Sequence, residues 1–217
     1  MNIRYNSIKA CLGLLVILTG WPTVTLAGMQ QGALEPENSN EARLNQLQPP
    51  DQVMDATGIQ PGMTVAEIGA GRGRYIVQLA VRVGEKGKVY AEDINSPALQ
   101  YCENRCRRWE LDHVETIRGD VADPKLPEAE LDVIFMISSY HEFTDPVALM
   151  RKARPALKAD GYVALVEWLP PENSGPGSLT PDKIEAQFKE AGYRLERTDR
   201  LLEANDLLIY IFRPDGR

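Results

Sequence analysis

Short runs of consecutive hydrophobic residues alternate along the chain with longer segments in which apolar residues recur every three or four positions. The runs are typical of strands buried in a sheet, and the longer segments are typical of helices that cover one. The pattern predicts strands over residues 63–68, 88–93, 114–118, 131–137 and 162–166, and helices over residues 52–57, 74–83, 96–109, 145–157 and 181–191. Strands that alternate with helices in this way predict a doubly wound, mostly parallel sheet.

Two further strands are predicted near the C-terminus, over residues 193–199 and 207–212. The segment between them is too short for a crossover helix, so we expect them to pair antiparallel. The predicted fold class is therefore α/β, with a doubly wound, mostly parallel sheet that ends in a C-terminal antiparallel hairpin.

The N-terminus has a different pattern. Two basic residues precede an apolar segment over residues 10–21, and Thr25-Leu26-Ala27 then place small residues where a signal peptidase cleaves. This is the layout of a secretory signal peptide, and the apolar segment is shorter than the roughly 20 residues of a spanning helix. The uncharged stretch as a whole covers residues 10–26, so an uncleaved anchor that contacts the membrane through them is the alternative.

The chain is expected to divide into a signal peptide or membrane anchor over residues 1–27, a polar lead-in over residues 28–47 and one domain over residues 48–217. The lead-in is rich in Gln, Asn and Glu, which indicates a loosely attached tether. Either interpretation of the N-terminus predicts a protein that is exported, to the periplasm or the medium, or anchored to the membrane and facing outward.

Charge and cysteine content narrow the range of functions. The formal net charge is −7, so a broad nucleic-acid-binding face is not expected. The basic run at Arg105–Arg108 is interrupted by Cys106 and is interpreted as a solvated helix face. Cys102 and Cys106 share one helical face with Leu99, which predicts buried thiols. The chain has only two histidines, neither near these cysteines in sequence, and no metal site is predicted.

A predicted strand runs into a glycine loop in the stretch VAEIGAGRGRY, residues 65–75. Gly69, Gly71 and Gly73 stand at alternate positions, and glycines let a backbone turn sharply and approach a ligand closely. The dinucleotide fingerprint G-x-G-x-x-G/A needs a small residue at the position of Arg74, so the loop does not fit that class.

With this loop the chain resembles the class I S-adenosylmethionine-dependent methyltransferases over residues 48–217. Three further features agree: the second strand ends in Glu92 and Asp93, Asp120 follows the third strand, and a reversed hairpin closes the sheet. The resemblance implies a Rossmann-like fold and S-adenosylmethionine as cofactor, with Asp93 at the ribose hydroxyls and Asp120 at the adenine amino group. The implied cofactor-binding residues are Glu67, Gly69, Gly71, Gly73, Asp93, Asp120, Val121 and Ser138.

Other roles stay open for the charged residues of this set. Asp93 also suits a helix cap, Asp120 a turn, and Glu67 a structural brace beneath the glycine loop. Arg72 and Arg74 suit either the carboxylate of the cofactor or solvent.

Methyl transfer from a sulfonium is an in-line displacement with a neutral leaving group, so an enzyme mainly aligns the acceptor and excludes water. A base helps where the acceptor is a neutral hydroxyl or a protonated nitrogen. The candidate catalytic residues follow the fourth and fifth strands, at the sheet edge where ligands bind: His141, Tyr140 and Glu167. His141 is the candidate base, Tyr140 a candidate pocket residue, and Glu167 the partner of a cationic acceptor or of His141. Each also suits a purely structural role.

The predicted function is methyl transfer from S-adenosylmethionine to a small-molecule acceptor. An NAD(P)-dependent oxidoreductase is an alternative that Arg74 disfavours. A non-catalytic binding protein on the same fold is another, because this cofactor is made in the cytosol and an exported enzyme needs a supply.

Overall fold

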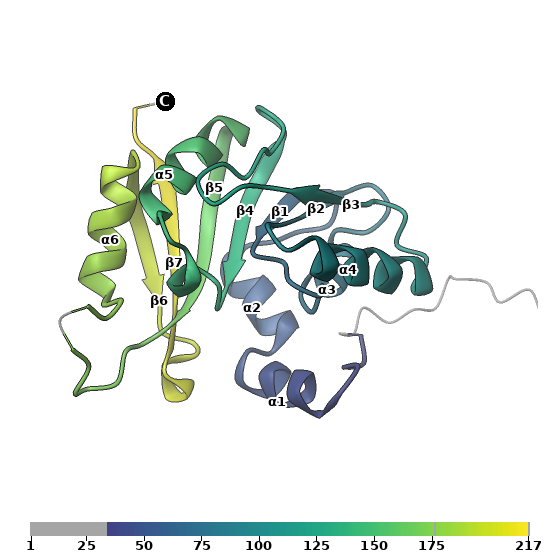
Figure 1. Ribbon diagram of the computed structural model, residues 1–217, viewed down its shortest axis with the longest axis horizontal. Helices are drawn as coiled ribbons and strands as arrows, with labels where there is room; N and C mark the ends of the chain where they lie inside the picture. The colour runs from purple at the N-terminus through teal and green to yellow at the C-terminus, as the bar shows by residue number, and fades with distance from the viewer. Residues whose placement is uncertain (1–33, 176, 217) are drawn as a thin grey trace, which may run out of the picture. The chain divides into compact units, whose positions relative to one another are not determined.

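The computed structural model describes residues 34–175 and 177–216, and a seven-stranded sheet forms the centre of this part of the chain. In spatial order the strands are β3 (Val114–Arg118), β2 (Lys88–Asp93), β1 (Thr64–Ile68), β4 (Leu131–Ile137), β5 (Leu157–Trp168), β7 (Leu207–Pro214) and β6 (Tyr193–Asp199). Strands β1 to β5 are parallel, and β7 is antiparallel to both β5 and β6. The predicted fold class is confirmed (Figure 1).

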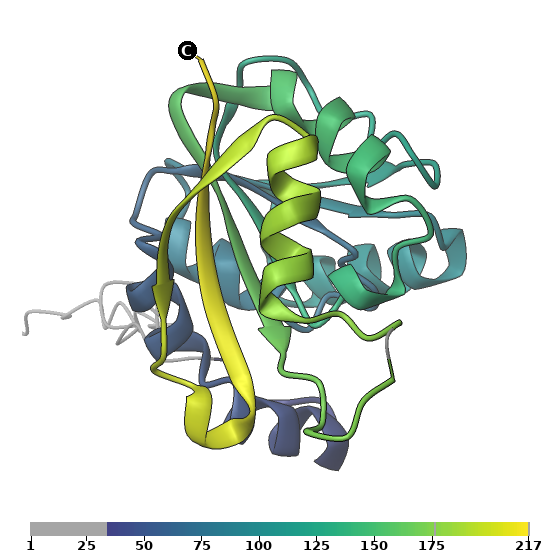
Figure 2. The same ribbon diagram turned by 90° about the vertical axis from the view of Figure 1, so that its left-hand side faces the viewer.

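Helices cover both faces of the sheet. Helices α2 (Pro50–Thr57), α3 (Ile76–Val83) and α4 (Ser96–Arg108) pack on one face, and α5 (Pro146–Ala153) and α6 (Pro181–Glu190) pack on the other (Figure 2). Side chains of β4 alternate between the two cores, with Phe135 in the first and Met136 in the second. This burial on both faces is what the continuous hydrophobic sequence of the strand predicts.

The largest boundary difference from the sequence pattern has a local cause. The helix predicted over residues 145–157 ends at Ala153, because Pro155 has no N–H to continue the helical hydrogen bonds. A 3₁₀ turn, η2 (Arg154–Ala156), follows, and β5 starts earlier than predicted, at Leu157. The other 3₁₀ turns are η1 (Tyr140–Glu142) and η3 (Glu203–Asn205).

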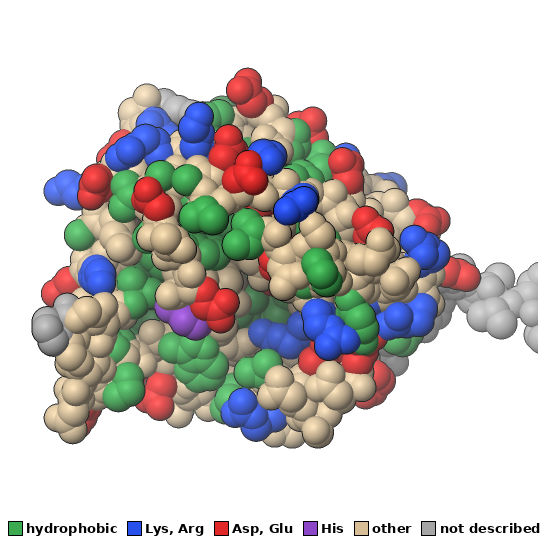
Figure 3. Space-filling model, in the orientation of Figure 1, with side chains coloured by type: hydrophobic (Ala, Val, Ile, Leu, Met, Phe, Trp, Pro, Cys, Tyr) green, Lys and Arg blue, Asp and Glu red, His purple; other side chains and the backbone are tan. Residues whose placement is uncertain are grey.

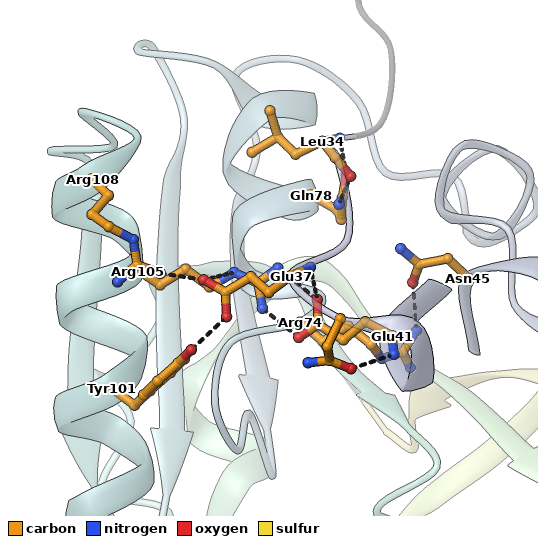
Figure 4. A network of polar contacts seen from close by, with 10 residues as sticks. Leu34, Glu37, Glu41, Asn45, Arg74, Gln78, Tyr101, Arg105 and Arg108 are labelled. Carbon is orange, nitrogen blue, oxygen red and sulfur yellow. Dashed lines mark hydrogen bonds and ion pairs between the residues drawn. The ribbon is translucent and has the colours of Figure 1, made fainter. Parts of the chain in front are cut away.

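Helix α1 (Ser39–Leu47) is not predicted by the sequence pattern. The helix is polar and docks through ion pairs: the two carboxylate oxygens of Glu41 accept hydrogen bonds of 2.7 and 2.9 Å from Arg105 on α4 (Figure 4). Just before the helix, Glu37 accepts a 2.8 Å hydrogen bond from Tyr101 and pairs with Arg108. The described part of the lead-in is therefore docked on the domain, whereas a loose tether was expected.

Arg105 also corrects the interpretation of the basic run on α4. Its side chain is 1% exposed, so the run is not a wholly solvated face. A guanidinium tolerates this burial because Glu41 supplies a paired, hydrogen-bonded charge. Cys102 and Cys106 are buried free thiols, which confirms that prediction.

The predicted signal peptide or anchor over residues 1–27 lies outside the described residues. Among the residues that are described, no helix is both long enough and apolar enough to cross a membrane. Both interpretations of the N-terminus therefore stay predictions.

Candidate functional site

A cleft lies at the carboxyl ends of β1, β2 and β4, on both sides of the point where the strand order reverses. Open α/β sheets bind ligands at such a point, because the connections on either side leave in opposite directions. The cleft has a volume of about 290 Å³, and its walls include Gly69, Asp93, Val121, Ser138 and Phe143. On the face shown in Figure 3, hydrophobic side chains gather along a hollow that charged side chains of both signs border.

The three glycines of the loop between β1 and α3 have different roles. All have positive φ, at +80° for Gly69, +53° for Gly71 and +80° for Gly73. A Cβ on Gly69 would lie 2.7 Å from the Cβ of Ser139, and one on Gly73 would lie 2.6 Å from the sulfur of Cys102. These two glycines therefore permit close packing. A Cβ on Gly71 would meet no described atom within 4 Å, so the loop leaves open space at that residue.

Asp93 stands at the end of β2 and holds the loop. One carboxylate oxygen accepts a 2.8 Å hydrogen bond from the N–H of Gly71, and the other accepts a 2.8 Å bond from the N–H of Asn95. The helix-capping role that was left open for Asp93 belongs to Asn95, whose side chain accepts a hydrogen bond from the N–H of Ala98. Asp93 thus combines a position on the cleft wall with a brace for the glycine loop.

Two exposed apolar side chains line the cleft beyond Asp93. Ile94 is 53% exposed and Val121 is 49% exposed, and both stand on its wall. Beside Val121, the carboxylate of Asp120 pairs with Lys125 at 2.7 Å, and this bond lowers the pKa of Asp120. Ile94 was not predicted. A local feature of the sequence could have indicated its exposure. An isoleucine that directly follows the acid at the end of a strand belongs to neither a strand nor a helix that would bury it.

A second cavity, of about 340 Å³, lies between α1 and the glycine loop and shares Gly69 and Gly71 with the cleft. Glu67, from β1, lines this cavity and is 3% exposed, and its Oε2 has no hydrogen-bond partner within the described part of the chain. Burial raises the pKa of Glu67 to about 8, although the nearby Arg74 opposes the rise. The unpartnered oxygen does not fit a structural brace.

Arg74 lines the same cavity and is tied to the end of α1. Its guanidinium donates hydrogen bonds of 3.1 Å to Asn45 and 2.6 Å to Gln48. Gln48 is fully buried and donates a 2.6 Å bond to the hydroxyl of Ser138, after β4. Ser138 has a φ of +52°, which is strained for a residue other than glycine and is typical of functional sites. No local signal in the sequence marks Gln48 as the link between these elements.

His141 and Glu167 form a pair at the ends of β4 and β5. The Nδ1 atom of His141 lies 2.9 Å from Glu167, which also accepts hydrogen bonds from the backbone N–H groups of His141 and Trp168. Glu167 is 1% exposed, and its contact with His141 is the pairing that the sequence analysis left open for it. If Nδ1 donates to this carboxylate, the lone pair of Nε2 is available on a side chain that is 41% exposed. A neutral imidazole held in this tautomer is suited to accept a proton.

Tyr140 does not belong to the cleft. It is 1% exposed and its ring stacks on Phe188 of α6, with Phe143 at its edge. Its hydroxyl donates a 3.3 Å hydrogen bond to Gln187. The ring packs in the core under α6 and is not part of the cleft wall. The structural role that the sequence also allowed is the one observed.

Comparison with known proteins identifies a family. A family model described as a methyltransferase domain matches residues 59–191. Nocamycin O-methyltransferase from Saccharothrix syringae is 29% identical over 135 residues, which cover 62% of this chain and 48% of that protein. The ubiquinone/menaquinone biosynthesis C-methyltransferase UbiE of Shewanella sp. (strain ANA-3) is 26% identical over 121 residues, 55% of this chain and 48% of that one. The chain thus spans about half the length of the curated relatives it matches.

The fold of one solved structure matches this chain over a larger share of the other protein's length than the curated relatives do. The crystal structure of a SAM-dependent methyltransferase from Aquifex aeolicus superposes with a TM-score of 0.69 at 26% identity, over 82% of this chain and 98% of that one. The matched family region, residues 59–191, contains the glycine loop, Asp93, Asp120 and the end of β4.

The residues present fit the cofactor that this family implies. The open space at Gly71 and the apolar walls at Ile94 and Val121 suit a nucleoside, and the unpartnered oxygen of Glu67 suits a polar group at its other end. Gly69 and Gly71 line both the cleft and the second cavity, so the glycine loop borders both spaces. The chain belongs to the methyltransferase domain family, with the class I fold and with S-adenosylmethionine as the methyl donor that this family implies.

Proposed function

We propose that the protein transfers a methyl group from S-adenosylmethionine to a small-molecule acceptor. The observation that carries the proposal is the cleft at the carboxyl ends of the strands, lined by the glycine loop and by Asp93, in a chain of the methyltransferase family. When bound, the cofactor supplies an electrophilic methyl group on a sulfonium. The protein aligns the acceptor and keeps water away.

In this proposal, different residues of the two cavities bind different parts of the cofactor. Ile94 and Val121 pack against the adenine, and the carboxylate of Asp93 accepts hydrogen bonds from the ribose hydroxyls. Asp120 reaches the adenine amino group in exchange for its contact with Lys125, which is exposed and so costs little to break. Arg74 binds the carboxylate at the methionine end.

A small acceptor is supported by two observations. The names of the two curated relatives refer to nocamycin and to ubiquinone and menaquinone, which are small molecules. The net charge of −7 disfavours a polyanionic acceptor such as nucleic acid. We place the acceptor beside His141, where Glu142 and Phe143 form the neighbouring cleft wall. There His141 takes the proton from a hydroxyl or an ammonium group.

For the N-terminus we propose export, with residues 1–27 as a cleaved signal peptide or an uncleaved anchor. The support is the apolar segment over residues 10–21 and the small residues at Thr25-Leu26-Ala27. N-terminal sequencing of the protein from its native host tests this. A first residue of Gly28 supports cleavage, an intact Met1 in the membrane fraction supports the anchor, and an intact Met1 in the cytosol contradicts both.

The function is tested first by cofactor binding. Thermal unfolding is measured with S-adenosylhomocysteine, the product form of the cofactor, and with NAD as the control ligand. A ligand at 100 times its dissociation constant stabilises the folded state by about 2.7 kcal/mol. We expect this shift with S-adenosylhomocysteine alone. Stabilisation by NAD without any by S-adenosylhomocysteine contradicts the proposal. A subsequent screen of phenols, amines and thiols with the methyl donor distinguishes an enzyme from a binding protein.

A further inference from the structure

The carboxyl group of Glu67 is unusual because it is buried, faces a cavity and has an oxygen without a partner. Its Oε2 is buried and accepts no hydrogen bond within the described ranges, and the side chain lines the cavity between α1 and the glycine loop. An ionised carboxylate in such a place is unfavourable, so the neutral acid is the stable form until a partner arrives. Burial accordingly raises the pKa of Glu67 to about 8, which is above neutrality.

The charges around Glu67 come from several elements. Arg74, in the loop before α3, favours ionisation, and Asp93 at the end of β2 disfavours it. Tyr75 at the start of α3 and Cys102 on α4 also face it, both uncharged at neutral pH because burial raises the pKa of the phenol and a hydrogen bond with Cys106 raises that of the thiol.

Arg74 does not neutralise Glu67 completely. Its guanidinium donates to Asn45 and Gln48, and it also interacts with Glu41 of α1. Arg72 and the glutamates Glu37 and Glu41 also line the cavity, and both glutamates are paired with arginines of α4. Next to the glycine loop the cavity therefore presents Arg74 as a permanent cation and Glu67 as a neutral acid. Such a pair is complementary to an α-amino acid group: Arg74 to its carboxylate, and Glu67 to its ammonium once the acid has ionised.

We propose that Glu67 is protonated in the ligand-free protein and loses this proton when the α-ammonium group of the cofactor binds beside it. The inference rests on the proposed function and deepens it, because it makes cofactor binding a proton-linked step. The O–H bond of the carboxyl group breaks, the proton passes to the buffer, and the ammonium keeps its own protons and donates to the new carboxylate. No electrons are transferred.

The proton is counted by isothermal titration calorimetry of the full chain with S-adenosylhomocysteine at pH 7. The binding enthalpy is measured in buffers of different ionisation enthalpy, and its slope gives the number of protons released. A group with a pKa of about 8 is mostly protonated at pH 7, so we expect about 0.9 proton per ligand. The dissociation constant should also fall about tenfold between pH 6 and pH 7, because less work is then needed to deprotonate Glu67.

Two controls locate the proton. The ligand 5′-methylthioadenosine has the adenosine part without the amino acid group, so it should bind without proton release. The variant Glu67→Gln has the same shape and no titration, and should bind S-adenosylhomocysteine without release or pH dependence. Glu92→Gln tests the rival source of the proton, because Glu92 is also buried, in the cleft wall, with a pKa raised to about 8. Whatever the affinity of this variant, the number of protons released per bound ligand should be unchanged.

The outcomes separate this inference from the proposed function. Binding of S-adenosylhomocysteine without proton release overturns the inference alone. Release with both ligands, release that is lost in Glu92→Gln, or release that persists in Glu67→Gln also overturns it, because the proton then comes from another group. Absence of any binding overturns the proposed function as well. If Glu67→Gln fails to fold, the comparison of the two ligands on the unaltered protein still decides the matter.

Discussion

Asp93 accepts two hydrogen bonds from backbone N–H groups and, in the proposed function, also accepts hydrogen bonds from the ribose hydroxyls. A carboxylate can accept several hydrogen bonds because each oxygen has two lone pairs, so the Gly71 and Asn95 contacts leave acceptor sites free. The residue therefore links the shape of the glycine loop to the presence of the ligand.

The substitution Asp93→Asn should weaken binding of S-adenosylhomocysteine by about 1.5–3 kcal/mol, the range for a hydrogen bond to a charged group. The side chain keeps its size and one acceptor, so the fold should persist. Calorimetry measures the affinity, and Asp112→Asn, at an exposed aspartate near the opposite end of the sheet, is the control. Equal affinities for the two variants would remove Asp93 from the ribose site.

His141 is the residue on which proton transfer depends in the proposed function. Once the screen has supplied an acceptor, His141→Ala should lower the turnover rate by about 10²- to 10⁴-fold, the usual contribution of a positioned base. Affinity for S-adenosylhomocysteine should stay unchanged. His113→Ala is the control, because His113 precedes β3 at the other end of the sheet and bonds the carbonyl of Ala80. Full turnover in His141→Ala would leave catalysis to alignment alone.

At the scale of elements, the glycine loop combines two kinds of glycine. Gly69→Ala places a Cβ 2.7 Å from Ser139, so it should lower the free energy of unfolding by clash as well as by backbone strain. Gly71→Ala has space for its Cβ and should lose only about 1–2 kcal/mol from the positive φ, while the methyl group occupies the open space proposed for the ligand.

Urea unfolding and calorimetry with S-adenosylhomocysteine distinguish these effects. We expect Gly69→Ala to be the less stable variant, and Gly71→Ala to lose more affinity than its stability change explains. A Gly71→Ala protein with unaltered affinity would place the cofactor elsewhere.

A buried ion pair between Glu41 and Arg105 contributes to the docking of helix α1. Burial opposes ionisation of Glu41, but hydrogen bonds from Arg105 and the N–H of Glu37 outweigh it, so the pKa of Glu41 is lowered. Glu41→Ala leaves the Arg105 charge buried with only the more distant Glu37, and should destabilise the docked helix by about 3 kcal/mol.

Hydrogen exchange of the amides in residues 39–47 measures this effect, with Glu35→Ala, at an exposed residue outside the helix, as the control. We expect faster exchange in Glu41→Ala only. Unchanged protection would mean that α1 is held by its other contacts, such as those of Asn45 and Gln48 with Arg74.

For the whole molecule, Glu67 and Glu92 predict how stability varies with pH. Burial raises the pKa of each to about 8, and the charge of Asp93 adds to both rises. In the unfolded chain the pKa of a glutamate is about 4.3. Between these values the folded protein binds more protons than the unfolded chain, so its stability falls as the pH rises. Each group contributes a slope of up to about 1.4 kcal/mol per pH unit.

Urea unfolding at pH 6, 7 and 8 should show this fall in the unaltered protein. Glu67→Gln and Glu92→Gln should each reduce the slope, because one titrating group is lost. Glu85→Gln, at an exposed residue, should leave it unchanged. If neither buried-site variant alters the slope, both carboxyl groups are ionised in the folded protein.

Local patterns in the sequence determined the fold class and the position of the glycine loop. The period of hydrophobic residues distinguishes strands from helices, and glycine spacing is a property of the few residues that form the turn. For this reason β2, β3 and β4 have the predicted bounds, and Gly69, Gly71, Asp93 and Val121 all stand on one cleft.

Only the tertiary structure decided which polar residues are paired, buried or free. Glu41 and Arg105 are 64 residues apart, and α1 lacks an apolar stripe that would have predicted its docking. Tyr140 and His141 are neighbours in sequence, yet the first is in the core under α6 and the second pairs with Glu167 at the surface. The unpartnered oxygen of Glu67 is likewise a property of the assembled cavity. Burial and charge pairing depend on residues distant in sequence, so no local pattern determines them.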